Sequence, residues 1–158
     1  MPNHADLIRH LRHFPDRLTM LVDPLTPEQR TTPYIPGEWT VAQIVHHLAD
    51  SHMQAYLRTK WVITVNEPTF LPYDQDAWAA QPHAMLADLT APLTLLRGLH
   101  HTWANLFDSL TPDQWTRLGH HPEFPGDPIT PARFLASYVA HGDGHIAQIN
   151  RTLAAAPK

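Results

Sequence analysis

The sequence predicts an all-α protein, a four-helix bundle with long crossover connections. Four stretches carry apolar residues at the three- and four-residue spacing of an amphipathic helix, and no useful length of sequence alternates as a β-strand does. The 16 prolines fall mainly between the periodic stretches, where they mark connections. At 158 residues the chain fits a single helical-bundle domain over 1–158, long enough to bury a core without covalent staples.

The first two long helices have clear start signals. Asn3 is a residue type that caps helix N-termini, and a helical apolar pattern follows it. Pro15 lies inside this pattern and is expected to kink or split the helix, because proline lacks the N–H that a helix interior uses. After a connection with at most one short helical turn, Thr40 and Gln43 form a capping-box signature. We therefore expect a second helix over 41–64.

The second half of the chain repeats this alternation of crossover and helix. Residues 66–82 are a proline-containing crossover, with a short helix expected near its centre. A third long helix is expected to begin near Asp88 or Thr90, and a long second connection follows it. Thr130 with Pro131 then predicts the start of the last helix, because proline is favoured at the first helical position.

Composition excludes several classes of function. The formal net charge of -4 and the pI near 6.3 leave no basic excess, so we expect neither nucleic-acid nor anionic-membrane binding. The absence of cysteine excludes disulfides, thiolate ligands and a cysteine nucleophile, so any metal must be held by nitrogen and oxygen. No signal-peptide pattern or membrane-length apolar run is present, and we expect a cytoplasmic protein.

Histidines in two predicted helices indicate a metal site. His141 and His145 are four residues apart, so both imidazoles can reach one ion at roughly 2.0–2.1 Å. The second helix contributes His46 and His47, of which only one can face the ion because helical neighbours point about 100° apart. His47 lies within or beside the apolar face and is favoured. Such a site would have three nitrogens and an open position.

The histidines allow other interpretations. A zincin motif is excluded because Gly142 stands where its general-base glutamate would be. Alternatively, His141 and His145 could simply hydrogen-bond to the backbone or to each other. His52 is expected at the surface or the rim. Gly142 and Gly144 suggest close approach of a helix or a ligand, although loose surface positions would also explain them.

Five segments in order resemble a known family. They are GEWTVAQIVHHLADSHMQAYLRTKWVIT, EPTFLPYDQDAW, LLRGLHHTWANLFDSL, HHPE and YVAHGDGHIAQI, and the match that contains them covers residues 32–153. Together they resemble the DinB/YfiT-like superfamily, specifically its YfiT/BstA branch. The resemblance implies a DinB-type four-helix bundle, commonly a homodimer, that binds a divalent metal through His47, His141 and His145.

The resemblance also implies two alternative activities, metal-dependent hydrolysis and thiol S-transfer with bacillithiol. We expect a Zn or Ni ion, and our first hypothesis is an S-transferase acting on electrophilic small molecules. Because the chain has no cysteine, the thiol must come from a low-molecular-weight cosubstrate. A hydrolase with the same ligands is the second hypothesis, and a non-catalytic, metal-stabilised helical stress protein is the third.

Further pocket residues are expected from their chemistry. Arg58 and Tyr73 are candidate substrate contacts, although Arg58 could instead pair with Asp50 or Asp74, and Tyr73 could pack on Trp78. The candidates for proton handling or ligand orientation are Asp50, His100 and Glu123.

Overall fold

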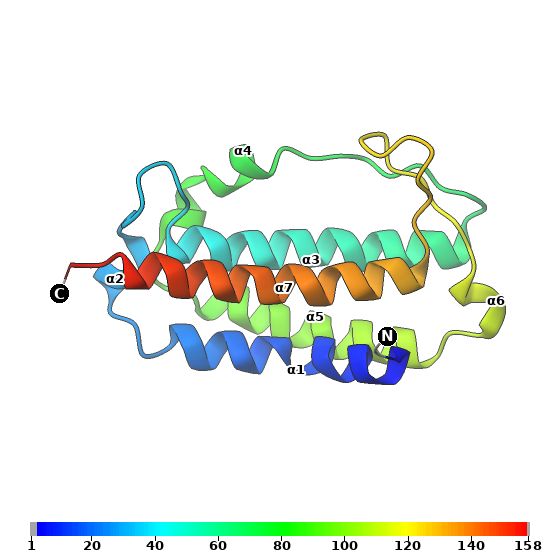
Figure 1. The fold of residues 1–158 in the computed structure, drawn as a ribbon, viewed down its shortest axis with the longest axis horizontal. Helices are drawn as coiled ribbons and strands as arrows, with labels where there is room; N and C mark the ends of the chain where they lie inside the picture. Colours follow the sequence, from blue (N-terminus) through cyan, green and yellow to red (C-terminus); the bar gives the residue numbers. More distant parts are fainter. Residues whose placement is uncertain (1–2, 158) are drawn as a thin grey trace.

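Four long helices form the body of the protein (Figure 1). The computed structural model describes residues 3–157. The long helices are α1 (His4–Val22), α3 (Val41–Thr64), α5 (Thr90–Asp108) and α7 (Pro131–Ala154). Four short elements lie in the connections: α2 (Pro27–Thr31), α4 (Gln75–Ala79), the 3-10 helix η1 (Pro82–Met85) and α6 (Pro112–Trp115). The predicted fold class is therefore confirmed, while η1 and α6 were not anticipated.

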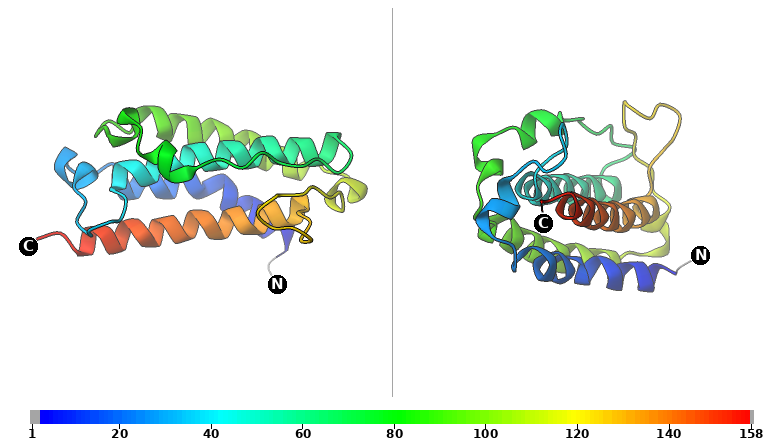
Figure 2. Two further views of the ribbon diagram at one scale, coloured as in Figure 1. Left: turned by 90° about the horizontal axis from the view of Figure 1, so that it is seen from above. Right: turned by 60° about the vertical axis from the view of Figure 1, so that its left-hand side comes forward.

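The order of the helices around the bundle differs from their order in the chain. Both α1 and α3 pack against α5 and α7, so the order around the bundle is α1, α5, α3, α7. Successive long helices α1 and α3 are thus diagonal to each other, as are α5 and α7 (Figure 2). The connections 65–89 and 109–130 meet through an isolated β-bridge between Thr69 and His120, and a second bridge, Gly119 with Ile129, lies within 109–130. None of the helices within 3–157 is long and apolar enough to cross a bilayer.

The predicted caps begin the helices as expected. The Asn3 side chain accepts a hydrogen bond from the Asp6 N–H at 2.8 Å. Thr40 Oγ1 accepts from the Gln43 N–H at 3.2 Å, and Gln43 Oε1 accepts from the Thr40 N–H at 3.0 Å. These bonds satisfy N–H groups that have no partner within the helix.

Pro15 does not split the first helix, because α1 continues through it from His4 to Val22. The proline still removes one helical hydrogen bond, since the residue at position 15 would otherwise donate to the carbonyl of Leu11, four residues earlier. The Leu11 carbonyl therefore has no donor from its own helix at that position.

Helices α1 and α7 approach closely at Gly142. A Cβ atom built there would lie 2.7 Å from Cε2 of Phe14, which is 2% exposed. Gly144, by contrast, has no neighbour within 4 Å of such an atom. The close approach of a helix is therefore found at Gly142, whereas Gly144 is an exposed position that fits the alternative of a loose surface site.

A candidate metal centre

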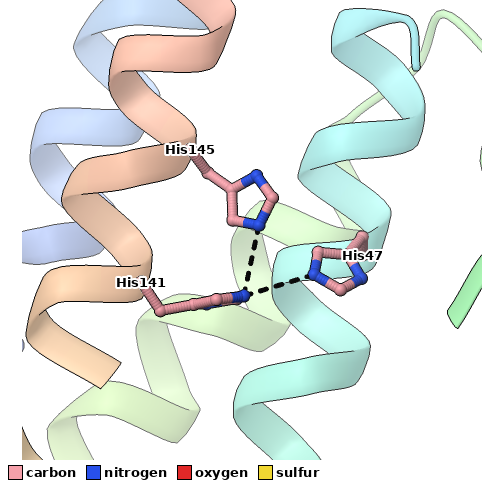
Figure 3. Close-up of side chains that lie close together, drawn as sticks. All are labelled: His47, His141 and His145. Carbon is pink, nitrogen blue, oxygen red and sulfur yellow. Dashed lines mark hydrogen bonds between the residues drawn. The ribbon is translucent and has the colours of Figure 1, made fainter. Parts of the chain in front are cut away.

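Three histidines from two helices converge in the bundle. His47 lies in α3, and His141 and His145 lie one turn apart in α7 (Figure 3). Nε2 of His141 is 3.3 Å from Nε2 of His47 and 3.2 Å from Nε2 of His145. One ligand atom from each residue lies within 4.8 Å of the other two. The predicted trio is thus brought together, and His46 points elsewhere, toward His83 at a ring-centroid distance of 5.4 Å.

The spacing of these nitrogens fits a divalent ion. Two ligands of a tetrahedral ion at 2.0–2.1 Å are about 3.3–3.4 Å apart, which is close to the two distances around His141 Nε2. Three imidazoles without thiolates also form the kind of nitrogen set that Zn, Ni and Cu prefer.

The surroundings keep these imidazoles neutral. Burial first, and the neighbouring histidines of the trio second, lower the pKa of His47 to about 4 and that of His141 to about 3. Burial also lowers the pKa of His145. A neutral imidazole offers the lone pair that a metal needs, so the cluster is in its metal-binding form at neutral pH.

Two other side chains hold the trio in place. Nδ1 of His145 lies 2.8 Å from Oε1 of Gln148, one turn further along α7. Because that oxygen only accepts, Nδ1 donates and Nε2 of His145 keeps its lone pair toward the centre. Trp39, just before α3, packs on His47 with ring centroids 4.7 Å apart and stacks on His145 at 6.4 Å. These supporting contacts were not predicted.

His52 and His100 lie behind the trio, and both are 0% exposed. Nε2 of His52 is 3.1 Å from Nδ1 of His141, and Nδ1 of His52 is 2.7 Å from Nε2 of His100. The expectation that His52 lies at the surface or rim is wrong, because neighbouring helices cover α3 on more than its one apolar stripe. His100 likewise faces the core and does not line the pocket beside the trio.

A pocket of about 630 Å³ opens beside His141. It lies between α3, α7 and the two crossovers, and its volume is in the range of small-molecule sites. Its lining combines cationic, acidic, hydroxyl and aromatic groups, among them Ser51, Arg58, Tyr73, His121, Glu123, Arg133, Phe134 and Tyr138.

Comparison with known proteins places the chain in a family. The model of the DinB superfamily matches residues 10–149. The chain belongs to the DinB superfamily. Within it, YfiT of Bacillus subtilis is 42% identical over 142 residues, which cover 90% of this chain and 79% of YfiT. A relative from Bacillus cereus is 37% identical over 142 residues, 90% of this chain and 80% of its own.

A solved structure of Bacillus subtilis YfiT extends the likeness to three dimensions. It matches this DinB-superfamily chain with a TM-score of 0.90 and 40% identity, covering 94% of this chain and 85% of the other. That protein is described as having an unusual four-helix bundle topology. YfiT and the Bacillus cereus relative carry the provisional name metal-dependent hydrolase.

The other predicted site residues of this DinB-superfamily protein are distributed unevenly. Arg58, Tyr73 and Glu123 all line the pocket. Glu123 is at an exposed position, its carboxylate 3.8 Å from Nδ1 of His121. Asp50 instead lies in a separate shallow depression with Trp78 and His83, so a role as base toward the pocket is not supported.

Among the described residues, Arg58 lacks the ion pairs that its neighbours in the sequence offer, whereas Tyr73 makes the expected contact with Trp78. Arg58 pairs with neither Asp50 nor Asp74 within the described chain; its Nη2 donates to the Leu71 carbonyl at 2.6 Å. Tyr73 does pack on Trp78, with ring centroids 4.5 Å apart, while still facing the pocket.

Proposed function

We propose that the protein is a metal-dependent enzyme that binds a divalent ion, Zn or Ni, through His47, His141 and His145. The observation that supports this most is the convergence of three neutral Nε2 atoms, two pairs of them 3.2–3.3 Å apart, beside a pocket of about 630 Å³. A bound divalent ion would lower the pKa of a water molecule or thiol so that it becomes a nucleophile near neutral pH.

We propose further that the nucleophile is a low-molecular-weight thiol of the bacillithiol type, transferred to an electrophilic small molecule. The chain has no cysteine of its own, and the pocket contains a cation suited to an acidic cosubstrate. Arg58 is 7% exposed, its Nε has no hydrogen-bond partner, and no carboxylate of the described chain forms an ion pair with it.

A buried guanidinium without a carboxylate is costly, because the hydrogen bond to the Leu71 carbonyl offsets only part of its desolvation. A carboxylate on the substrate or thiol would supply the missing partner and orient it beside His141. Tyr73, whose pKa is raised mainly by burial, is protonated at neutral pH and can donate a hydrogen bond to the same molecule. Glu123, at the exposed edge of the pocket, is the remaining candidate for accepting a proton.

The metal site is tested by metal analysis of protein purified without a nickel column, followed by titration with Zn²⁺ and Ni²⁺. We expect one ion per chain in the wild type and loss of tight binding in His47→Ala, His141→Ala and His145→Ala. His46→Ala is the matched control, because His46 adjoins His47 in the sequence but lies outside the trio. Unchanged binding in all three variants would refute the ligand assignment.

Metal-dependent hydrolysis is the second candidate, favoured by the name that YfiT carries. The two activities separate when Zn²⁺-loaded protein is incubated with a chlorodinitrobenzene or an epoxide, with and without a carboxylated thiol. Thiol-dependent product formation above the uncatalysed rate supports the transferase. Turnover of ester or amide substrates without thiol supports the hydrolase, and binding of metal with no turnover in either assay supports a stabilising role. The homodimer is likewise a proposal, which sedimentation velocity tests.

A further inference from the structure

Three histidines from α5, α3 and α7 form a chain of contacts that begins at a backbone carbonyl of α1 and ends on the proposed metal ligand His141. The Leu11 carbonyl in α1 lies 2.7 Å from Nδ1 of His100 in α5, whose Nε2 lies 2.7 Å from Nδ1 of His52 in α3. Nε2 of His52 in turn lies 3.1 Å from Nδ1 of His141 in α7. The contacts follow the order of the helices around the bundle. Of the residues in this chain of contacts, His141 lines the pocket, whereas Leu11, His100 and His52 do not.

The Leu11 carbonyl fixes which ring nitrogen carries the proton in each of the three histidines. A carbonyl oxygen can only accept, so Nδ1 of His100 carries the proton. His100 and His52 are fully buried and have no carboxylate among their hydrogen-bond partners, so each is neutral and carries a single ring proton. Nε2 of His100 therefore accepts, and Nδ1 of His52 donates.

The position of the ring protons on His52 and His141 follows in the same way. Nε2 of His52 has no proton, so it accepts from Nδ1 of His141. Nε2 of His141 then presents a lone pair toward His47 and His145. Gln148 fixes His145 in the same tautomer. The Nε2 lone pairs of His141 and His145 therefore face each other at 3.2 Å, an arrangement that a cation between them would stabilise.

Pro15 leaves free the Leu11 carbonyl at which this chain of histidines begins. Any other residue at position 15 would carry the N–H that a helix directs at the Leu11 carbonyl. Proline leaves that carbonyl without this donor, and His100 donates to it instead, at 2.7 Å. The interior proline, unfavourable for α1 alone, thus makes an acceptor available to a residue on α5.

We propose that His52 and His100, anchored by the Leu11 carbonyl that Pro15 leaves free, are positioning residues that hold His141 in its Nδ1–H tautomer for metal binding. The proposal rests on the proposed metal site. The chain ends on a carbonyl, which does not take up a proton, so it orients the ligand and does not carry protons to solvent. This assigns His100 a role different from the proton handling expected from the sequence.

The first test reads the tautomers directly in metal-free protein. Long-range ¹H–¹⁵N correlation spectra of the ¹⁵N-labelled protein at neutral pH distinguish Nδ1–H from Nε2–H for each imidazole. We expect Nδ1–H for His100, His52 and His141. In His100→Phe, which keeps a ring of similar size, His52 and His141 should lose this fixed pattern. An Nε2–H tautomer at His141 in the wild type would overturn the proposal.

The second test measures Zn²⁺ affinity by chelator competition. Loss of such outer hydrogen bonds to a ligand typically costs roughly 10–100-fold in metal affinity, and we expect that loss in His52→Phe and His100→Phe. Phe107→Leu is the control for general destabilisation, because Phe107 is buried in the core but outside the histidine chain. Affinity equal to the wild type in both histidine variants would refute a positioning role.

Pro15→Ala separates positioning from stability. The restored N–H competes with His100 for the Leu11 carbonyl, so we expect a higher melting temperature together with several-fold weaker Zn²⁺ binding. A purely structural role of the histidine chain would move both quantities in the same direction. If the wild type binds no Zn²⁺ while the tautomers are as assigned, the proposed function fails and the tautomer assignment stands.

Discussion

The close approach of α1 and α7 at Gly142 predicts opposite effects for two substitutions in the same helix. In Gly142→Ala the new Cβ would lie 2.7 and 2.8 Å from two ring carbons of Phe14, whereas favourable carbon contacts lie at about 3.5–4.0 Å. The Phe14 ring is stacked on His52 at 5.3 Å and on His100 at 5.2 Å, so it has little room to move. Gly144→Ala meets nothing within 4 Å.

The magnitudes follow from two opposing effects. Replacing an interior helical glycine by alanine stabilises a helix by about 0.8–1.0 kcal/mol, and both variants gain this. Overpacking costs about 1–3 kcal/mol and applies only to Gly142→Ala. We therefore expect Gly144→Ala to raise the free energy of unfolding by about 1 kcal/mol. Gly142→Ala should be about 1–3 kcal/mol less stable than Gly144→Ala.

Urea unfolding of the metal-free protein, followed by circular dichroism, measures both values. For a chain of this size 1 kcal/mol corresponds to about 2–4 °C in melting temperature, so thermal melts give an independent estimate. The double variant Phe14→Leu/Gly142→Ala should recover part of the cost through a coupling energy above about 0.5 kcal/mol. Equal stability of Gly142→Ala and Gly144→Ala would show that the contact with Phe14 carries no strain.

Three further predictions concern the pocket, acid stability and helix capping. Arg58→Met should raise KM for carboxylated substrates by roughly 10- to 150-fold, the equivalent of a charged hydrogen bond of about 1.5–3 kcal/mol, and leave KM for neutral analogues unchanged. An equal increase in KM for carboxylated and neutral substrates would exclude an anion-binding role. Burial lowers the pKa of His100 to about 4, so the unfolded chain binds the extra proton below about pH 6.5. The unfolding free energy of the metal-free protein should be constant above that pH and fall between about pH 6.5 and 4. His100 should contribute up to about 1.4 kcal/mol per pH unit to this fall, and its contribution should vanish in His100→Phe. Thr40→Ala should cost about 0.5–2 kcal/mol in urea unfolding by removing the α3 cap, and a smaller loss would assign capping to Gln43 alone.

The long helices and the convergence of the histidine trio could be predicted because their signals are local. Thr40 with Gln43 marks a helix start within four residues, and His141 with His145 shares one face through helical spacing alone. The angle between helical neighbours allows only one of His46 and His47 to face the ion, and the apolar face favours His47. The family resemblance then resolved the choice.

The residues behind the trio could not be predicted because their partners lie far away in the sequence. His52 is buried because α5 and α7 both cover α3, a fact of bundle topology that the pattern within α3 does not contain. The role of Pro15 depends on His100, 85 positions later, whose imidazole reaches the Leu11 carbonyl. An unusual proline inside a helix pattern was visible, but the donor to the Leu11 carbonyl that it leaves free is found only once α1 and α5 are side by side.

The packing of Trp39 on His47 and His145 gives the protein an optical reporter. An indole packed beside two of the proposed metal ligands lies close enough for a paramagnetic ion such as Cu²⁺ or Ni²⁺ to quench its emission, whereas Zn²⁺ would mainly shift it. Comparing the wild type with Trp39→Phe would isolate this signal from the other four tryptophans. Occupancy and exchange of the ion could then be followed in stopped-flow experiments without any added dye.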